Sequence, residues 1–303
     1  MSEVVRTDAL SKRYGRTTAV RSLDLVVHRG SIFGYLGPNG AGKTTTIRML
    51  VGLLRPTSGS ATVLGHDVVR DRDEMQRRVG YLPGAFVAYP DLTAWEYLRF
   101  LGHLRGGIDE TRVAGLAGRL SLDLDRHIGT MSHGNKQKVG IVQALAHDPE
   151  LVVLDEPTSG LDPLVQREFL EILREHRDAG TTVLLSSHVL SEVEAVADEV
   201  AILRDGALVV VEAVDRLKAR AQRRVDLVLE HDGAVATLLR TPGVHRVDGT
   251  GRRLQVSVEG SMAALFSAAA PYGIERAVTH EPGLEEIFLG YYEQHHEHEE
   301  VVR

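Results

Sequence analysis

The 303-residue sequence contains no cysteine and no long apolar run. Without cysteine, the chain forms no disulfide and offers no thiolate for catalysis or metal binding. No stretch approaches the roughly 20 apolar residues of a membrane-spanning helix, so we do not expect the chain to cross a bilayer by itself. The opening residues, MSEVVRTDAL, also lack the apolar core of a signal peptide. These features are compatible with a cytoplasmic location.

The sequence also lacks an excess of positive charge, since its formal net charge is −7. A basic surface is what attracts nucleic acid, and we therefore expect no nucleic-acid partner. The chain is 43% hydrophobic and 25% charged, proportions that are typical of a globular protein. Its length favours two domains.

One stretch, Ser31 to Leu54, combines the features of a phosphate-binding loop. An apolar strand over Ile32 to Leu36 precedes a glycine-rich turn, and an apolar helix over Lys43 to Leu54 follows it. This is the spacing G-x-x-x-x-G-K-[ST] in its required context. Backbone N–H groups and the helix N-terminus bind phosphate there, while Lys43 reaches the β- and γ-phosphates and Thr44 ligates Mg²⁺. The predicted binding residues are Gly37, Pro38, Asn39, Gly40, Ala41, Gly42, Lys43, Thr44 and Thr45.

Further polar groups follow apolar strands later in the chain. The run LVVLDEP ends in Asp155 and Glu156, and TTVLLSSH ends in His188. Asp155 can hold Mg²⁺, and Glu156 can polarise an attacking water as a general base. We expect His188 to face the γ-phosphate from the carboxyl end of its strand. Met131 to Lys138 opens a helix whose Ser-x-Gly start provides a second anion site.

Periodicity predicts an α/β fold for residues 1–214. Apolar strands that alternate with helices indicate a mainly parallel sheet covered on both faces, and alternating strands near the N-terminus form an antiparallel part. A helical subdomain is expected over residues 91–146, where Thr93 and Glu96 have the spacing of a capping box. The predicted strands are Val4 to Leu10, Val20 to His28, Ile32 to Leu36, a pair within Gly59 to Val69, Arg77 to Leu82, Leu151 to Leu154, Thr181 to Ser186 and Glu199 to Arg204.

A second domain is predicted over residues 215–292, after a charged helix that starts near Val214. Its order, β-α-β-β-α-β with a final helix, indicates a small α+β, ferredoxin-like arrangement. The tail, residues 293–303, is rich in His and Glu. We predict a solvated, disordered end for it, with metal binding as the alternative.

The ordered motifs resemble those of the ATPase subunit of ATP-binding cassette (ABC) transporters over residues 3–215. Residues 37–45 are similar to Walker A, 151–156 to Walker B, 131–138 to the signature motif and 159–162 to the D-loop. Tyr14 resembles the aromatic residue that stacks on adenine, and His188 the switch histidine. The resemblance implies a P-loop NTPase cassette fold that binds ATP and Mg²⁺. Its catalytic residues would be Glu156, His188 and Lys43, with Thr44 and Asp155 as the metal ligands.

The same resemblance implies partners. ATP would lie between two subunits, most simply a homodimer, so that Ser132 and Gly134 serve the nucleotide of the partner. Residues 281–289 are similar to the end of ATPase subunits from type-2 multidrug and antibiotic ABC exporters. Those subunits power a separate membrane permease from the cytoplasmic face of the membrane, which implies export of a drug, antibiotic or lipid-like substrate.

The sequence departs from the family pattern in two places. Gly84 stands where the family usually has Gln, and the signature, commonly LSGGQ, is MSHGN here. Ser132 and Gly134 are kept, while His133 and Asn135 replace Gly and Gln. Gly84 has no side chain that could contact Mg²⁺ or water. We expect the anion site at the helix start to persist.

Two other functions are compatible with parts of the pattern. One is a soluble ABC ATPase that acts in translation or DNA maintenance; such proteins typically carry two cassettes or a long coiled-coil insertion, and this sequence has neither. The other is a regulatory module in which the C-terminal domain senses a ligand, since its predicted fold hosts many functions. Simple support of the cassette dimer is the structural alternative for that domain.

Overall fold

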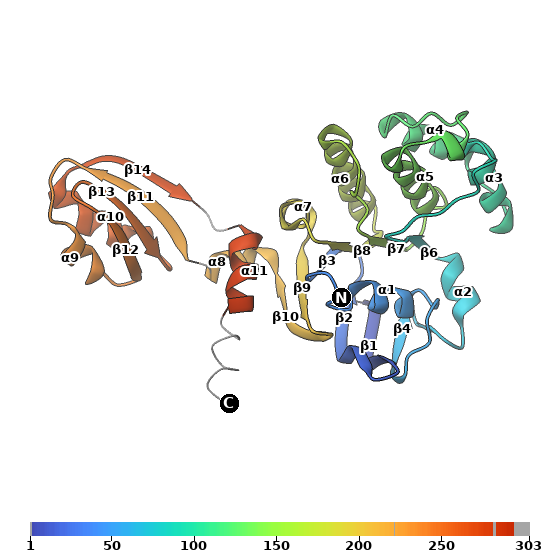
Figure 1. Ribbon diagram of the computed structural model, residues 1–303, viewed down its shortest axis with the longest axis horizontal. Coiled ribbons are helices and arrows are strands. Elements are labelled where there is room, and N and C mark those ends of the chain that lie inside the picture. Colours follow the sequence, from blue (N-terminus) through green and yellow to red (C-terminus); the bar gives the residue numbers. More distant parts are fainter. Residues whose placement is uncertain (1, 221, 281–282, 294–303) are drawn as a thin grey trace. The chain divides into compact units, whose positions relative to one another are not determined.

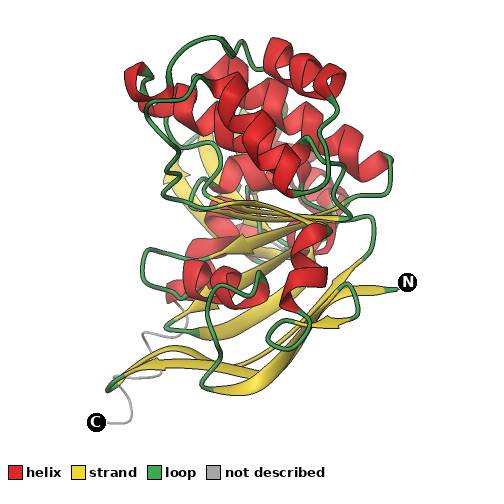
Figure 2. Ribbon diagram, turned by 90° about the vertical axis from the view of Figure 1, so that its right-hand side faces the viewer, coloured by secondary structure: helices red, strands yellow, loops and turns green. Residues whose placement is uncertain are grey.

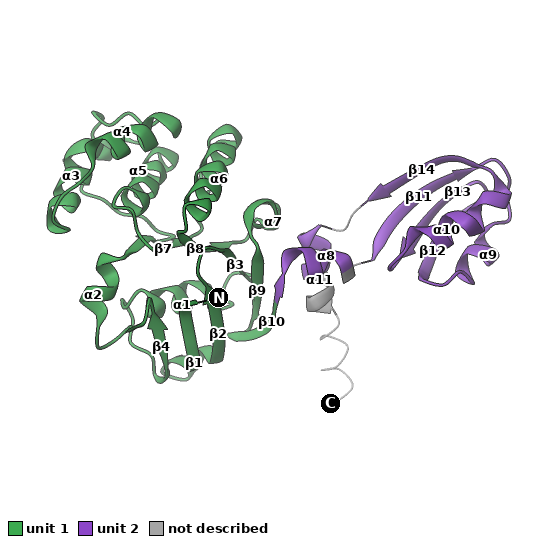
Figure 3. Cartoon of the chain, turned by 180° about the vertical axis from the view of Figure 1, so that it is seen from behind, with its two compact units in different colours: residues 1–211 green, residues 212–303 purple. Residues whose placement is uncertain are grey.

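The computed structural model describes residues 2–220, 222–280 and 283–293. The chain divides into two compact units, residues 1–211 and 212–303, which Figure 3 colours separately. No helix within the described residues combines the length and the apolar character that a membrane span needs. The predicted tail spans residues 293–303, and all of it except residue 293 lies outside the described residues.

A six-stranded sheet forms the centre of the first unit, with the order β10-β9-β3-β8-β7-β6. Strands β3, β8, β7 and β6 pair in parallel, as do β3 and β9. Every residue of β3, β7 and β8 is buried, which explains why these strands are mainly apolar and show no alternation. The strands are β3 (Ile32–Leu36), β6 (Val79–Leu82), β7 (Leu151–Asp155), β8 (Thr182–Ser187), β9 (Glu199–Arg204) and β10 (Ala207–Ala213).

Helices and a second sheet cover the two faces of this sheet. Figures 1 and 2 show most helices on one side, and α1 with the antiparallel sheet β2-β1-β4-β5 on the other. The helices on the first side are α3 (Ala94–Leu104), α4 (Glu110–Arg119), α5 (His133–Leu145), α6 (Pro163–Asp178) and α7 (Leu190–Val196). The opposite layer contains α1 (Lys43–Leu50), β1 (Glu3–Tyr14), β2 (Thr17–His28), β4 (Ser58–Val63) and β5 (His66–Asp67).

Local signals in the sequence explain where several helices begin. The predicted capping box at α3 is confirmed, because Thr93 Oγ1 accepts from the Glu96 N–H at 3.2 Å and Glu96 Oε2 accepts from the Thr93 N–H at 2.8 Å. The Asp162 side chain caps α6, whose first residue is Pro163. Thr93 and Asp162 suit the cap position because their side-chain oxygens accept a hydrogen bond from a free backbone N–H. Proline suits the first helical position because it has no N–H that would need a partner.

Several segments differ from the sequence-based expectation, including β1, which runs to Tyr14 rather than Leu10. Helix α1 ends at Leu50 rather than Leu54. The predicted strand over Arg77 to Leu82 is instead β6, preceded by the short helix α2 (Arg72–Arg77), which buries only Met75 and therefore has no visible apolar period. Strand β10 was not predicted; its residues are mostly half-buried, so the chain there lacks a strong alternation.

The second unit contains a four-stranded antiparallel sheet with the order β12-β13-β11-β14. Two helices, α9 and α10, provide the apolar side chains that complete its core, among them Leu238 and Leu265. The elements are α8 (Val214–Arg220), β11 (Arg223–Leu229), α9 (Val235–Leu239), β12 (Val244–Thr250), β13 (Arg253–Val258), α10 (Met262–Ala269), β14 (Ile274–His280) and α11 (Leu284–Glu293). This is the β-α-β-β-α-β order with the central pairing of a ferredoxin-like domain.

Candidate nucleotide-binding and hydrolysis site

The glycine-rich loop between β3 and α1 has a backbone that only glycine adopts easily. Gly40 and Gly42 have φ values of 85° and 100°, in a region that disfavours any residue with a Cβ. A Cβ on Gly42 would also lie only 2.5 Å from the Ala19 carbonyl oxygen. The loop can therefore turn sharply into α1 and present its N–H groups to an anion.

Lys43 is a buried cation at the start of α1, with 6% of its surface exposed. Its Nζ donates to the carbonyl oxygens of Gly37 at 2.6 Å and Pro38 at 3.3 Å. A carboxylate oxygen, Glu156 Oε1, lies 3.6 Å from the same nitrogen. The amine is thus held inside the loop and faces the carboxylate of Glu156.

Asp155 is a buried carboxylate held by two hydroxyl groups. Its Oδ2 accepts from Thr44 Oγ1 at 2.8 Å, and its Oδ1 accepts from Ser186 Oγ at 2.6 Å. The parallel register of β7 and β8 sets Asp155 directly beside Ser186. Carboxylate and hydroxyl oxygens are the ligands that Mg²⁺ prefers, so the pair Thr44 and Asp155 fits this ion chemically. A Cβ on Gly84 would lie 3.2 Å from Asp155 Oδ2.

Glu156 follows with an unusual backbone, because its φ is 54°. A left-handed conformation costs a residue with a side chain about 1–3 kcal/mol and persists only where the surroundings enforce it. The Glu156 N–H donates to the Ser186 carbonyl oxygen at 3.1 Å. Glu156 Oε2 accepts from the His188 N–H at 3.3 Å and also contacts His188 Nδ1. The carboxylate is therefore fixed between Lys43 and His188.

A third carboxyl group, Glu192 on α7, lies near the end of β8. Burial raises its pKa, although its Oε2 accepts from Thr158 Oγ1 at 2.6 Å and from Ser187 Oγ at 3.3 Å. Glu192 therefore takes up a proton more readily than an ordinary glutamate. Its contacts tie the turn after β7 to the end of β8.

The phosphate loop and the ends of β7 and β8 enclose a cavity of about 390 Å³. Nine of the residues predicted for the site line it: Pro38, Asn39, Gly40, Gly42, Lys43, Thr44, Thr45, Glu156 and His188. Three further lining residues, Ala19, Gly84 and Ser159, were not predicted as site residues. Asp155 does not line the cavity itself but accepts a hydrogen bond from Thr44, which does. Side chains from distant parts of the chain therefore meet at the carboxyl ends of parallel strands.

Six predicted residues lie outside this cavity lining. Gly37 and Ala41 belong to the phosphate loop, Asp155 contacts Thr44 in it, and the other three lie elsewhere. Tyr14 is half-exposed at the end of β1, with Lys12 Nζ 5.3 Å from its ring centre. Ser132 caps α5, where its Oγ accepts from the Asn135 N–H at 3.3 Å. Gly134 packs on the D-loop, since a Cβ there would lie 2.2 Å from the Gly160 carbonyl oxygen. Within one chain, the signature residues and the phosphate loop thus form separate groups.

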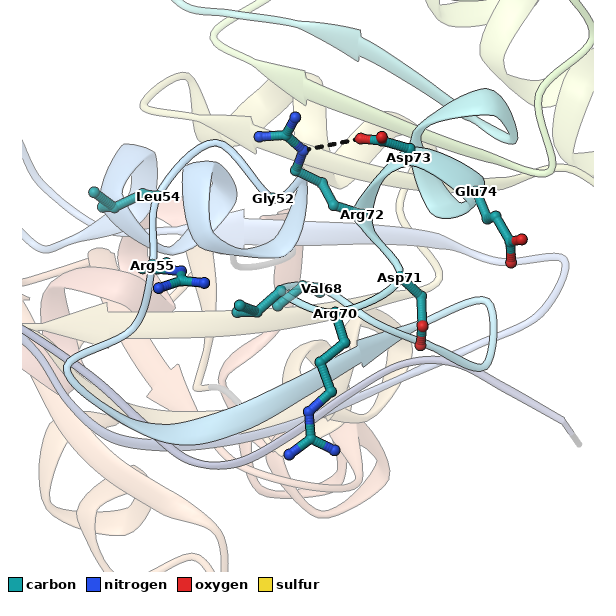
Figure 4. A pocket seen from close by; sticks show the side chains of 10 residues that line it. Gly52, Leu54, Arg55, Val68, Arg70, Asp71, Arg72, Asp73 and Glu74 are labelled. Carbon is teal, nitrogen blue, oxygen red and sulfur yellow. Dashed lines mark hydrogen bonds and ion pairs between the residues drawn. The ribbon is translucent and has the colours of Figure 1, made fainter.

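Another cavity, of about 460 Å³, lies between the end of α1 and α2 (Figure 4). Its lining carries as many acidic as basic side chains, and Arg72 pairs with Asp73 at 3.2 Å. The cavity contains no glycine-rich turn that would direct several N–H groups at one anion. The phosphate-loop cavity is therefore the better candidate for a nucleotide.

Comparisons with known proteins agree with this geometry. Residues 20–159 match the family described as ABC transporter. The chain is 38% identical over 245 residues to the bacitracin transport ATP-binding protein BcrA of Bacillus licheniformis, covering 79% of each chain. The chain belongs to the ABC transporter family. It is also 38% identical to the daunorubicin/doxorubicin resistance ATP-binding protein DrrA of Streptomyces peucetius, covering 76% of this chain and 72% of that protein.

A solved ATP-binding subunit of an ABC transporter resembles the cassette with a TM-score of 0.66 and 32% identity, covering 71% of this chain and 92% of that one. The predicted family, the cassette fold and the ATPase class are therefore confirmed. The relatives named here are transport and resistance subunits, which favours export over the alternative in translation or DNA maintenance.

Sequence reasoning missed two polar residues that support the site, Ser186 and Gln137. The signal that could have found Ser186 is the predicted parallel pairing, because a hydroxyl at the end of β8 that is in register with Asp155 lies beside it on the same face of the sheet. Gln137 is wholly buried on α5, and its Nε2 donates to the carbonyl oxygens of Glu156 and Pro157. No spacing rule reveals that contact.

Proposed function

We propose that this ABC protein is the ATP-hydrolysing subunit of an exporter, and that it works at the cytoplasmic face of the membrane. One observation carries the hydrolytic part of the proposal. Glu156 faces Lys43 at 3.6 Å in the cavity of the phosphate loop, directly after the carboxylate that Thr44 holds. A base, a phosphate-binding cation and a metal-ligand pair thus meet in one place.

In the proposed reaction, the loop N–H groups and Lys43 bind the β- and γ-phosphates of ATP. Thr44 and Asp155 would hold Mg²⁺, which neutralises phosphate charge when bound. Glu156 accepts a proton from water as the water oxygen bonds to the γ-phosphorus, and the bond from that phosphorus to the ADP oxygen breaks. His188 keeps the carboxylate of Glu156 in place. Tyr14 is proposed to stack on adenine.

A second copy of the chain is proposed to complete each site. Ser132 and Gly134 stand at the N-terminus of α5 but do not line the cavity of their own chain. A helix N-terminus attracts phosphate, so these residues would suit the nucleotide held by another subunit. The complete motif set in one chain favours a homodimer, and closure of that dimer would be the movement that ATP drives.

A membrane permease is the proposed second partner, and an exposed apolar surface supports this. Val87 and Tyr89 are 84% and 56% exposed, on the segment that begins at Gly84 in the cavity. The ring centres of Tyr89 and Phe100 lie 6.0 Å apart, and Phe100 is 44% exposed. Exposed apolar clusters commonly mark interaction sites. This surface could pass movements of the phosphate site to a permease that exports a drug, antibiotic or lipid-like substrate.

Replacement of Glu156 by Gln tests the hydrolytic role. Glu156→Gln should keep ATP binding but lose hydrolysis, because the amide cannot accept the proton of water, and ATP should trap the variant as a dimer in size-exclusion chromatography. Glu171→Gln, at an exposed glutamate of α6 that pairs with Arg174, should hydrolyse ATP at the parent rate. Hydrolysis by Glu156→Gln at the parent rate would show that another group acts as the base.

Affinity capture of the protein from detergent-solubilised native membranes tests the transport role. A multi-span membrane protein recovered at near-equal stoichiometry would support the exporter and identify the permease. Recovery with ribosomal or DNA-associated proteins from the soluble fraction alone would contradict the exporter and leave the ATPase in place.

A further inference from the structure

Gln137 makes a contact that connects two motifs of the cassette. It lies on α5, one turn beyond the helix start that Ser132 caps, and it is wholly buried. Its Nε2 donates to the Glu156 carbonyl oxygen at 3.3 Å and to the Pro157 carbonyl oxygen at 3.0 Å. Because carbonyl oxygens only accept hydrogen bonds, the amide nitrogen rather than the amide oxygen must face them.

The backbone that Gln137 contacts is the strained segment of the site. Glu156 has a φ of 54°, which its side chain disfavours. On the amide side, the Glu156 N–H is held by the Ser186 carbonyl oxygen at 3.1 Å. Pro157 has no N–H and so cannot add a bond of that kind. Gln137 provides the matching support on the carbonyl side, so that the left-handed turn is held from both directions.

The other end of the same amide argues against a purely structural role. Gln137 Oε1 is buried and accepts no hydrogen bond from the described part of the chain. A buried acceptor without a donor opposes folding. An apolar side chain of similar length would fill the space without that unpaired oxygen, but it would leave the two carbonyl groups beside Glu156 without a donor. The amide is therefore explained by the two hydrogen bonds that it donates beside Glu156, and not by packing alone.

We propose that Gln137 is a positioning residue for ATP hydrolysis, which holds the Glu156 backbone so that the carboxylate points into the phosphate-loop cavity. The same contact ties Glu156 to α5, whose N-cap is Ser132 and whose first turn contains Gly134. When a nucleotide bound to a second copy draws in the start of α5, the position of Glu156 changes with it. This inference rests on the proposed function, because it requires Glu156 to act as the base.

Steady-state kinetics of Gln137→Met, in the full-length protein, test the proposal. Methionine keeps the length of the side chain and removes both donors. We expect kcat to fall about 10- to 100-fold, as misplaced catalytic groups do, while KM and the dissociation constant for ATP stay within about twofold. The matched control is Gln143→Met on the same helix, where Oε1 accepts from the Tyr97 hydroxyl at 2.7 Å, away from Glu156. Its kcat should equal that of the parent.

A second variant, Gln137→Glu, keeps the proposal testable if Gln137→Met does not fold. A deprotonated carboxylate would face two carbonyl oxygens without a donor, whereas the protonated form donates one hydrogen bond. Burial should raise the pKa of the new carboxyl group above the ordinary glutamate value of about 4.3. The kcat of the variant relative to the parent should therefore be lowest near pH 8, where the group is charged, and recover in part near pH 6, where more of it is protonated. A residue that only fills space would give a pH-independent ratio.

The outcomes distinguish a failure of the role proposed for Gln137 from a failure of the proposed ATPase function. Parent-like kcat in both variants, or an equal rise in KM and in the ATP dissociation constant, would overturn the role of Gln137 and leave the ATPase standing. Failure of both variants to fold, with Gln143→Met intact, would assign the amide to folding and also overturn it. A parent protein that binds ATP but never hydrolyses it would overturn the proposed function itself.

Discussion

Ser186 offers a sharp test of how the metal-ligating carboxylate is held. Ser186→Ala removes the hydroxyl that donates to Asp155 Oδ1 at 2.6 Å, deep in the fold, where Asp155 is 1% exposed. A hydrogen bond to a charged group contributes about 1.5–3 kcal/mol. We expect the free energy of unfolding to fall by that amount, which is about 10- to 150-fold in the unfolding equilibrium. The same Oγ also accepts from the Glu156 N–H at 3.3 Å, but this N–H keeps the Ser186 carbonyl oxygen as an acceptor in the variant.

Urea unfolding of the variant and of a matched control gives the comparison. Ser31→Ala removes a hydroxyl that donates to a neutral acceptor, the His28 carbonyl oxygen at 2.8 Å, away from the cavity, and should cost only about 0.5–1.5 kcal/mol. Ser186→Ala should also raise the Mg²⁺ concentration that gives half-maximal ATPase activity, since Asp155 keeps its bond from Thr44 but loses the one that holds its other oxygen. Equal losses in the two variants, together with an unchanged Mg²⁺ response, would refute the reasoning.

Two other substitutions test the charge at the site and the burial of a histidine. Lys43→Ala should abolish hydrolysis and weaken ATP binding in calorimetric titrations, because the loop loses the cation that faces the cavity; parent-level turnover would contradict this. Burial lowers the pKa of His147 from 6.5 to about 4, so the folded chain resists protonation that the unfolded chain accepts. Stability is then complete above about pH 6.5 and falls by up to about 3 kcal/mol as the pH drops towards 4. His147→Gln should show a smaller acid loss in urea unfolding, and an identical pH profile would argue against the buried neutral imidazole.

Much of the fold could be predicted, because its central strands are buried on both faces. Mainly apolar segments such as Ile32 to Leu36 and Glu199 to Arg204 predicted strand boundaries that the structure confirms. The short elements α2 and β10 were not predicted, for a physical reason. Helix α2 buries a single side chain, and β10 has no clean alternation, so neither leaves the periodic signal on which prediction depends.

The candidate site could be predicted as far as its chemistry depends on local motifs. The spacing of the phosphate loop fixes Lys43 and Thr44 because both functions follow from one turn and one helix start. Contacts between distant segments could not be predicted in the same way. The bond from Gln137 to the Glu156 carbonyl oxygen depends on how α5 packs beside β7, and periodicity specifies only that this face of α5 is buried.

Strand β10 has a consequence for anyone who divides this protein into pieces. The two units separate after Val211, yet β10 continues to Ala213 and forms the edge of the six-stranded sheet beside β9. A fragment that ended before Ala207 would leave β9 with open backbone groups along its edge, a surface that pairs readily with other chains and causes aggregation. A fragment that runs through Val214 retains the protecting strand. Insolubility of a shorter cassette would thus report a stripped sheet edge rather than a need for the C-terminal domain.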